Sequence, residues 1–328
     1  MATVRAWCRA DLAGGTLDIW PLGLFHPGAR TVNLALDLAV TVQIEPLPSG
    51  SGYCVRQGES ALSAGSIAEL TASVDGALAG TIAAALDLPP FEAILASESP
   101  RGGGLGASSA MAVALIAAAE EAFDRPRTTA AEKVHLARDL EARLMGLPTG
   151  IQDHYPALLG GVLEIAALPG GERVRSLSVD LEALGDRLLI VYSGQSHFSA
   201  GQNWQVVRRR LDGEAEVTGL FEGIAAVAAA LPAALEAGDW QQVGELVGRE
   251  WSYRRRLAAG VSIPQLETLL ERARALGAWG GKACGAGGGG CLAVLCPPDR
   301  RAAIAAAMEE AGGRVLKARP VGPQSHSL

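Results

Sequence analysis

Two glycine-rich segments have the residue types that hold phosphate groups. Residues 100–110 (PRGGGLGASSA) lie between an apolar, strand-like run and a helix-forming run. Glycines let the backbone turn with positive φ, so the N–H groups of the loop and of the next helix can face an anion. Residues 282–290 (KACGAGGGG) precede another apolar run. A structural turn is the alternative for either segment alone, but two such loops favour phosphate binding.

Two acidic residues between these loops have the chemistry needed to transfer a group to a hydroxyl. Asp153 follows a Pro/Gly turn, where its carboxylate can point into a cleft and orient or deprotonate a hydroxyl. Glu141 lies late in a predicted helix and could reach a metal ion. The alternatives are a turn cap for Asp153, and for Glu141 a solvated helix face or an ion pair with Arg138.

The glycine spacing also fits a dinucleotide-binding fingerprint, which would indicate an oxidoreductase. That fingerprint needs a strand before the glycines and a helix after them. The second loop is followed by a strand, which disfavours this alternative. The matching positions are Gly285, Gly287 and Gly290 in the second loop, and Gly102, Gly104 and Ala107 in the first.

The elements that position these residues follow from hydrophobic periodicity. A period of two over residues 31–45 predicts a long, half-buried strand shared between two ladders. Thr129 and Glu132 predict a capping box for a helix that runs to Met145. The remaining strands are predicted at 3–9, 91–97, 159–168, 173–181, 187–193, 291–296 and 314–320, and the remaining helices at 66–87, 108–123, 298–311 and over most of 199–277.

Composition restricts the class of protein. The chain has 328 residues, 49% hydrophobic and 19% charged, with a net charge of −7, which excludes disorder and opposes binding to nucleic acid or anionic membranes. The five cysteines show no C-x-x-C spacing, and the N-terminus lacks the apolar core of a signal peptide. Alanine-rich stretches are interrupted before the ~18 residues of a membrane span. These features predict a cytoplasmic protein with reduced thiols.

Four ordered segments of the chain resemble the GHMP kinase superfamily. Residues 100–110 resemble its P-x-x-x-G-L-G-S-S-A motif, and residues 282–290 its K-x-x-G-A-G-G-G-G loop. Residues 5–21 (RAWCRADLAGGTLDIWP) and 149–161 (TGIQDHYPALLGG) are similar to segments of the sugar-kinase branch, which includes galactokinases and bacterial heptose-phosphate kinases. The resemblance implies an α+β, two-domain fold with the active site in the interdomain cleft. We expect the domains to span residues 1–185 and 186–328.

The resemblance also implies roles for individual residues. Asp153 would be the catalytic base, and Arg9 would stabilise charge near the transferred phosphoryl group. Ser109 and Glu141 would bind Mg²⁺, and Asp18 would bind sugar hydroxyls. The ATP phosphates would be held by Pro100, Gly102, Gly103, Gly104, Leu105, Gly106, Ala107, Ser108 and Ser109. The acceptor would also meet Gly14, Gly15, Gln152, Ser196, His197, Gly287 and Gly288.

Several positions depart from the family pattern and bear on the acceptor. Trp7 replaces a proline, Thr16-Leu17 replace Gly-Thr, and Ala107 replaces a serine. His154 stands where glutamine is usual, and His197 replaces an arginine, which weakens the case for a sugar phosphate over a free sugar. A Ser-rich helix cap is the alternative for residues 193–199.

The functional prediction is an ATP- and Mg²⁺-dependent kinase acting on a sugar or sugar phosphate, as a monomer or homodimer. A mevalonate-type kinase is the alternative within the superfamily. A non-catalytic regulator that binds ATP or a sugar is a further alternative. The arginine runs at 208–210 and 254–256 are predicted to lie on solvated helix faces.

Overall fold

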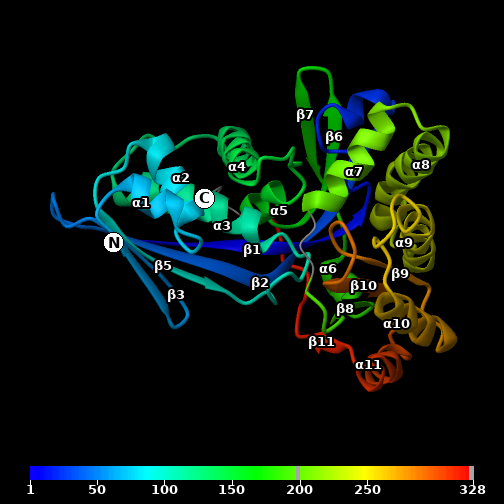
Figure 1. Ribbon diagram of the computed structural model, residues 1–328. Helices are drawn as coiled ribbons and strands as arrows, with labels where there is room; N and C mark the ends of the chain where they lie inside the picture. The colour runs from blue at the N-terminus through cyan, green and yellow to red at the C-terminus, as the bar shows by residue number, and fades with distance from the viewer. Residues whose placement is uncertain (197–199, 325–328) are drawn as a thin grey trace.

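The computed structural model describes residues 1–196 and 200–324 and contains two β-sheets with helices packed on them (Figure 1). The larger sheet has the strand order β4-β3-β5-β2-β6-β7, with β1 paired to β2. This mixed architecture confirms the predicted α+β class. The strands of this sheet are β1 (Ala2–Ala13), β2 (Arg30–Pro46), β3 (Tyr53–Gln57), β4 (Ser60–Ala64), β5 (Phe91–Ser97), β6 (Val162–Leu168) and β7 (Gly171–Ser176).

Strand β2 is the central strand of the larger sheet. It is shared between ladders, as its length predicts. One edge pairs with β1, and the other edge pairs with β6 at its start and β5 at its end. Between them, Ala35 and Asp37 bond to the returning C-terminal segment through Val321 and Arg319. Backbone groups of the strand therefore find partners along its whole length, as burial requires. The strand is more deeply buried than predicted, because several helices pack against it.

Helices lie along one face of this sheet (Figure 1). The central one, α3, is buried over most of its length and contacts both β1 and β2. The predicted capping box of α4 is present, with Thr129 and Glu132 bonded reciprocally. The helices are α1 (Ile67–Ala72), α2 (Ala77–Leu86), α3 (Ala107–Ala122), α4 (Ala130–Met145) and α5 (His154–Leu159).

The smaller sheet has the order β11-β8-β10-β9 and is covered by α9, α10 and α11. Its strands fall within residues 188–316, and those of the larger sheet within 2–176. The division at residue 185 remains a prediction. The elements here are α6 (Leu181–Gly185), β8 (Leu188–Tyr192), α7 (Ala200–Leu211), α8 (Ala215–Ala237), α9 (Trp240–Arg254), α10 (Pro264–Ala275), β9 (Gly280–Ala283), β10 (Cys291–Leu295), α11 (Arg301–Glu310) and β11 (Arg314–Leu316).

Several predicted boundaries are wrong for local reasons. The helix predicted over 66–87 is two helices, because the Ser73 hydroxyl bonds to the Leu70 carbonyl and Gly76 begins a new helix. The segment before β6 is helical: α5 ends at Gly160, which has a φ of 65°. Residues 317–320 do not continue β11 but return to the larger sheet. The short strands β3, β4 and β9 have too few residues to show a period.

Helix α8 is apolar and long enough to cross a membrane by length and composition, so the prediction that every apolar stretch is too short is wrong here. Its apolar face, including Leu220, Phe221 and Ile224, is buried against other parts of the protein. Core packing therefore explains its composition.

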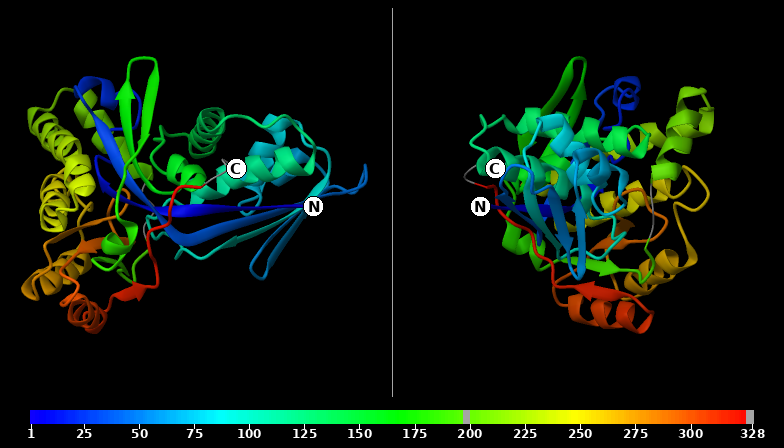
Figure 2. Two further views of the ribbon diagram at one scale, coloured as in Figure 1. Left: turned by 180° about the vertical axis from the view of Figure 1, so that it is seen from behind. Right: turned by 60° about the vertical axis from the view of Figure 1, so that its left-hand side comes forward.

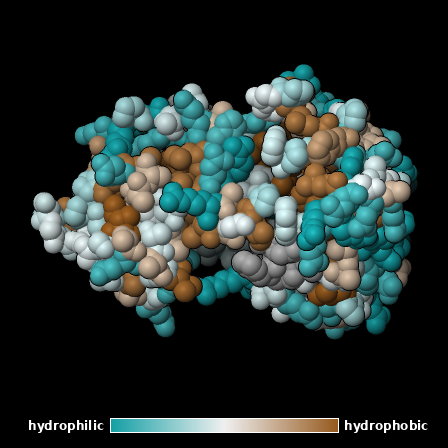
Figure 3. All heavy atoms as spheres, turned by 45° about the horizontal axis from the view of Figure 1, so that its top comes forward, coloured by the Kyte–Doolittle hydropathy of each residue, from teal (hydrophilic) through white to brown (hydrophobic). Residues whose placement is uncertain are grey.

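The two sheets lie in separate lobes joined by the ends of β1 and β2 and by the returning C-terminal segment (Figure 2). The surface seen in Figure 3 is hollowed between these lobes. All five cysteines are free thiols.

Candidate active site

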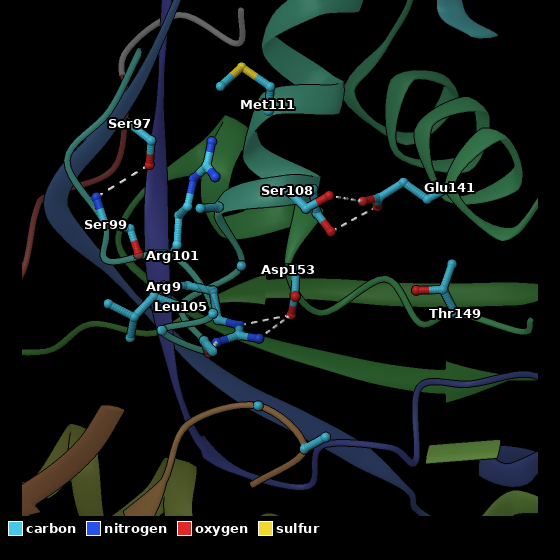
Figure 4. Close-up of a pocket in the computed structure, with 18 of the residues that line it drawn as sticks. Arg9, Ser97, Ser99, Arg101, Leu105, Ser108, Met111, Glu141, Thr149 and Asp153 are labelled. Atoms are coloured by element: carbon cyan, nitrogen blue, oxygen red, sulfur yellow. Dashed lines mark hydrogen bonds and ion pairs between the residues drawn. The ribbon is translucent and has the colours of Figure 1, made fainter. Parts of the chain in front are cut away.

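A cavity of about 850 Å³ brings both glycine-rich loops together with the predicted acidic residues (Figure 4). Its walls come from β1, the start of α3, α4, and the turn before α5. Most of the predicted site residues line it. These are Arg9, Asp18, Pro100, Gly102, Gly103, Gly104, Leu105, Gly106, Ala107, Ser108, Ser109, Glu141, Gln152, Asp153 and Gly287.

The first glycine loop turns directly into α3. Gly106 is the N-cap residue, with a φ of 70°, and it provides no side chain to the first N–H groups of the helix. The two serines do not cap the helix either, because both hydroxyls donate to Glu141. The helix start therefore offers free N–H groups and a positive dipole end to the cavity, which is the arrangement that binds phosphate.

Gly104 fixes the distance between the two loops. Its φ is 69°, and a Cβ there would lie 2.5 Å from the carbonyl oxygen of Cys284 at the start of the second loop. The approach is between two backbones, so a side chain cannot simply rotate away.

We expect Gly104→Ala to lower ATP affinity by at least about tenfold, because the loops must separate and a displacement of about 1 Å costs up to about 10²-fold at such sites. Calorimetric titration with ATP would measure this. Gly213→Ala is the matched control: Gly213 has a φ of 79° in an exposed turn, with nothing within 4 Å of a Cβ. Equal ATP affinity in the two variants would contradict a role for the contact with Cys284.

Arg9 connects the first glycine loop to Asp153. Its Nη1 donates to the Gly104 carbonyl at 2.5 Å, and its backbone N–H donates to the Leu105 carbonyl at 2.9 Å. Its Nε and Nη2 lie 2.8 and 2.6 Å from Oδ1 of Asp153. Burial lowers the pKa of Arg9, but Asp153 and Asp11 outweigh burial and raise it overall. The guanidinium is therefore a fixed positive charge between loop and carboxylate.

Asp153 occupies the N-cap position of α5 but makes no capping hydrogen bond, so the turn-cap alternative is wrong. Both bonds from Arg9 go to Oδ1. Oδ2 has no hydrogen bond within the described part of the chain. Since the side chain is 25% exposed, this oxygen is accessible to a hydroxyl in the cavity.

Glu141 is buried and is not on a solvated face, so that alternative is wrong, and Arg138 pairs with Asp139 instead. The carboxylate accepts hydrogen bonds from Ser108 (2.9 Å) and Ser109 (2.8 Å), and its Oε2 lies 2.7 Å from Nε2 of His154. Burial raises the pKa of Glu141, but the bonds from His154 and the serines outweigh it, and the pKa is lowered overall. Glu141 is therefore an anion beside the start of α3.

This cluster fits a magnesium site. Carboxylate and hydroxyl oxygens are ligands that Mg²⁺ prefers, and Glu141 and Ser109 supply both types. Among the described residues, no three His, Cys, Asp or Glu side chains are grouped to hold a metal. Mg²⁺ usually keeps only one or two protein ligands and takes the rest from substrate phosphates and water.

Asp18 lines the cavity and also fixes the segment before Asp153. Its Oδ2 accepts the backbone N–H groups of Ile151 (2.7 Å) and Gln152 (2.9 Å). Its Oδ1 is closed off from solvent and has no partner among the residues that the structure describes. Burial raises the pKa of Asp18; the Gln152 N–H opposes this, and Asp153 adds to it.

Asp18→Asn should raise the melting temperature at pH 8 while weakening acceptor binding. A carboxyl whose pKa is raised by folding stabilises the fold below its unfolded pKa of about 3.9 and loses that contribution as pH rises through the folded pKa. The variant's advantage should therefore be absent near pH 4 and grow with pH, reaching about 1 kcal/mol. Calorimetry between pH 4 and 8 would measure it, and an unchanged or lower melting temperature at pH 8 would contradict it.

In the same variant, we expect the KM for the acceptor to rise on the order of tenfold, the worth of one hydrogen bond to a charged group. Steady-state kinetics with an acceptor that supports release of ADP would measure it. An unchanged KM would remove Asp18 from acceptor binding.

Other predicted acceptor residues do not line the cavity. Gly14 instead allows a close approach to the Arg30 carbonyl, and the Gly15 carbonyl accepts a bond from Arg254. Gly288 donates to the Val261 carbonyl, and Ser196 is exposed. His197 lies outside the described residues. The second glycine loop joins β9 to β10, so it does not lead into a helix and the dinucleotide alternative is wrong for this loop.

Four buried ionic residues behind the cavity are missed by the sequence reasoning: Asp11, Glu250, Arg254 and Lys282. Asp11 lies in the family-like segment 5–21 and Lys282 in the segment 282–290, but no spacing within these segments indicates that the two side chains pair. Arg254 belongs to a run predicted to be solvated, and that prediction is wrong for this residue, which is 1% exposed. It lies on the inner face of α9 beside Glu250, one turn away.

Comparison with known proteins agrees with this geometry. Family models for the GHMP kinases N terminal domain and the GHMP kinases C terminal region match residues 66–161 and 230–314. Human galactokinase is 29% identical over 64% of this chain and 60% of its own length. A mevalonate kinase from Methanothermobacter thermautotrophicus is 30% identical over 64% and 66%. The chain thus matches about two thirds or less of these relatives.

The fold agreement is wider. The crystal structure of a D-glycero-D-manno-heptose 1-phosphate kinase from Bacteroides thetaiotaomicron superimposes with a TM-score of 0.78, at 21% identity, over 98% of this chain and 97% of that one. The same architecture is therefore present along nearly the whole chain.

Proposed function

Since this chain belongs to the GHMP kinase family, we propose that it transfers the γ-phosphoryl group of ATP to a hydroxyl of a small molecule, with a sugar or sugar phosphate as the acceptor. One observation carries the proposal. A single buried arginine, Arg9, holds both the carbonyls of the phosphate loop and the carboxylate of Asp153. The donor phosphates and the acceptor hydroxyl would thus meet on either side of one fixed positive charge.

The chain's own groups have separate duties in this reaction. The N–H groups at the start of α3 would bind the phosphates of ATP, and Glu141 with Ser109 would hold Mg²⁺. The bound ion would neutralise charge on the phosphate oxygens. Asp18 and Asp153 orient the acceptor hydroxyl.

The transfer step then needs little covalent work from the protein. The acceptor oxygen forms a bond to the γ-phosphorus as the bond from that phosphorus to the bridging oxygen of ADP breaks. The hydroxyl proton passes to Oδ2 of Asp153, and Arg9 stabilises the developing charge. The products are ADP and a phosphate ester.

The charges beside Asp153 favour a polyhydroxylated acceptor over mevalonate. Asp18 lines the cavity together with Asp153, and sugar hydroxyls are donors that would pair with these carboxylates. The neighbouring cations Arg9, Lys282 and Arg254 are all paired with carboxylates. An anionic group placed at this wall would meet like charge, so the wall suits the hydroxyls of a sugar, and a phosphate on a sugar acceptor would have to lie elsewhere in the cavity.

The test is acceptor-dependent release of ADP from Mg-ATP over a panel of hexoses, heptose 7-phosphates, uronic acids and mevalonate. Release with a sugar or sugar phosphate supports the proposal and identifies the acceptor class. Release of ADP with mevalonate alone would overturn the sugar assignment and indicate a mevalonate-type kinase. Binding of ATP without release of ADP on any acceptor would favour a non-catalytic regulator.

A further inference from the structure

From the cavity wall inward, six ionic side chains form a continuous series of alternating charge that joins the two lobes. From Asp153 it passes to Arg9, whose Nη1 lies 3.6 Å from Oδ1 of Asp11. Asp11 pairs with Lys282, and Lys282 lies 3.9 Å from Oε2 of Glu250. The chain ends at Arg254, paired with Glu250 at 2.6 Å. The four residues after Arg9 are at most 1% exposed.

Buried ions are costly to desolvate, so a chain of this length is poor evidence for stability alone. The charges alternate, three positive and three negative, and each has a neighbour of opposite sign. Although burial raises the pKa of Asp11, the charges of Lys282, Arg9 and Arg254 outweigh it and lower that pKa overall. Asp11 is therefore ionised, and the function of this series of ionic pairs is to be sought in what it holds in place.

Asp11, in the middle of this series of ionic pairs, holds the second glycine loop. Oδ1 of Asp11 accepts the backbone N–H of Gly285 at 2.6 Å. Lys282 also donates to the Asp11 carbonyl at 3.1 Å, so it fixes both the side chain and the backbone of this residue. Asp11 and Arg9 lie two residues apart on β1 and thus on the same side of the strand. Lys282 therefore acts on the loop at Gly285 and on the pair of Arg9 with Asp153.

Arg254, at the other end of this series of ionic pairs, holds the segment that leads to Asp18. Nη2 of Arg254 donates to the Gly15 carbonyl at 2.8 Å, and its Nη1 lies 3.3 Å from the Thr16 hydroxyl. Thr16 has a φ of 73°, which is rare for a β-branched residue and persists only where the surroundings hold it. Because Arg254 is on α9, the second lobe maintains the shape of an acceptor-binding segment in the first.

We propose that Arg254 and Lys282 are positioning residues with separate effects: Arg254 holds the segment of Gly15 to Asp18 for acceptor binding, and Lys282 aligns Asp11, Arg9 and Gly285 for the transfer step. This inference rests on the proposed kinase function. It predicts that truncation at one end changes binding and truncation at the other changes turnover.

The kinetic test compares Arg254→Met with Lys282→Met. We expect Arg254→Met to raise the acceptor KM by about tenfold with kcat within about threefold. Lys282→Met should lower kcat by about tenfold with the acceptor KM within about threefold. Arg254→Lys keeps the charge but loses the planar guanidinium. Its acceptor KM should therefore lie closer to that of Arg254→Met than to that of the wild type on a logarithmic scale. A common loss of both parameters in both variants would overturn the separation.

Lys133→Met is the matched control, because Lys133 is equally buried and pairs with Glu120 at 2.8 Å outside the charge chain. This variant should lower the melting temperature without a selective change in either the acceptor KM or kcat. Where a single variant fails to fold, the charge-balanced pairs Arg254→Met/Glu250→Gln and Lys282→Met/Asp11→Asn replace it, with the same expected split.

Amide hydrogen exchange provides a readout that does not need an acceptor. Arg254→Met should expose the amides of Leu17 and Ile19, which bond back to Gly14 and Thr16 in the turn. Lys282→Met should expose the amide of Gly285. If the wild-type protein releases no ADP, the proposed function fails, while this exchange pattern still decides the positioning roles. Equal exchange changes in both segments, or changes matched by Lys133→Met, would overturn the inference.

Discussion

Replacement of Asp153 by asparagine is expected to lower kcat by about 10²- to 10⁴-fold, the usual contribution of a general base. Asparagine keeps the shape and the oxygen that Arg9 binds, but its amide cannot accept the hydroxyl proton. The measurement is ADP release at saturating ATP and acceptor. The KM for ATP should change little, because the phosphate loop is bound by Arg9 and not by Asp153.

The control for this prediction is Asp186→Asn, which removes an exposed ion pair with Arg319 away from the cavity. It should leave kcat unchanged, since exposed pairs contribute about 1 kcal/mol or less to stability. A kcat within threefold of wild type in Asp153→Asn would show that this carboxylate neither accepts the proton nor orients the hydroxyl.

The second large effect is expected at Glu141. Glu141→Gln should raise the Mg²⁺ concentration for half-maximal activity about 10- to 100-fold, because the site loses its protein anion. Titration of nucleotide binding with Mg²⁺ would show the same shift without turnover. Unchanged metal dependence would make Glu141 only a structural partner of Ser108, Ser109 and His154.

Glu141→Gln should also change the dependence of stability on pH. The folded pKa of Glu141 is lowered, so the carboxylate stabilises the fold above its unfolded pKa of about 4.3 and loses this contribution as pH falls through the folded value. The variant should therefore be less stable than wild type at pH 7 and approach it in acid. Glu120→Gln, which disturbs a buried carboxylate paired with Lys133, is the control that leaves Mg²⁺ dependence unchanged.

The arrangement of the site has a simple structural basis. The groups that would bind phosphate come from loops and helix starts, where backbone N–H groups are free. The groups that would act on the acceptor come from the turn after β1, which carries Asp18, and from the turn before α5, which carries Asp153. Arg9 is the contact between these two sets, and the second lobe closes over it through Gly285 and Arg254.

The sequence by itself determined the parts of the site that depend on local chemistry. Glycines between a strand and a helix indicated the first glycine-rich loop of the cavity, and the capping box of Thr129 and Glu132 placed the helix that carries Glu141. The ordered motifs indicated the family and its α+β fold. These signals can be read from sequence because each depends on residues that are close along the chain.

Only the tertiary structure decided which charges are buried and what they hold. Arg254 and Arg255 are neighbours in one run, yet the first is 1% exposed and the second pairs with Glu267 at the surface. Likewise, nothing local to Glu141 shows that it meets the two serines 32 and 33 residues away. Burial and pairing depend on contacts between distant segments, so the free energy that selects one partner over another is set by packing and is absent from local sequence patterns.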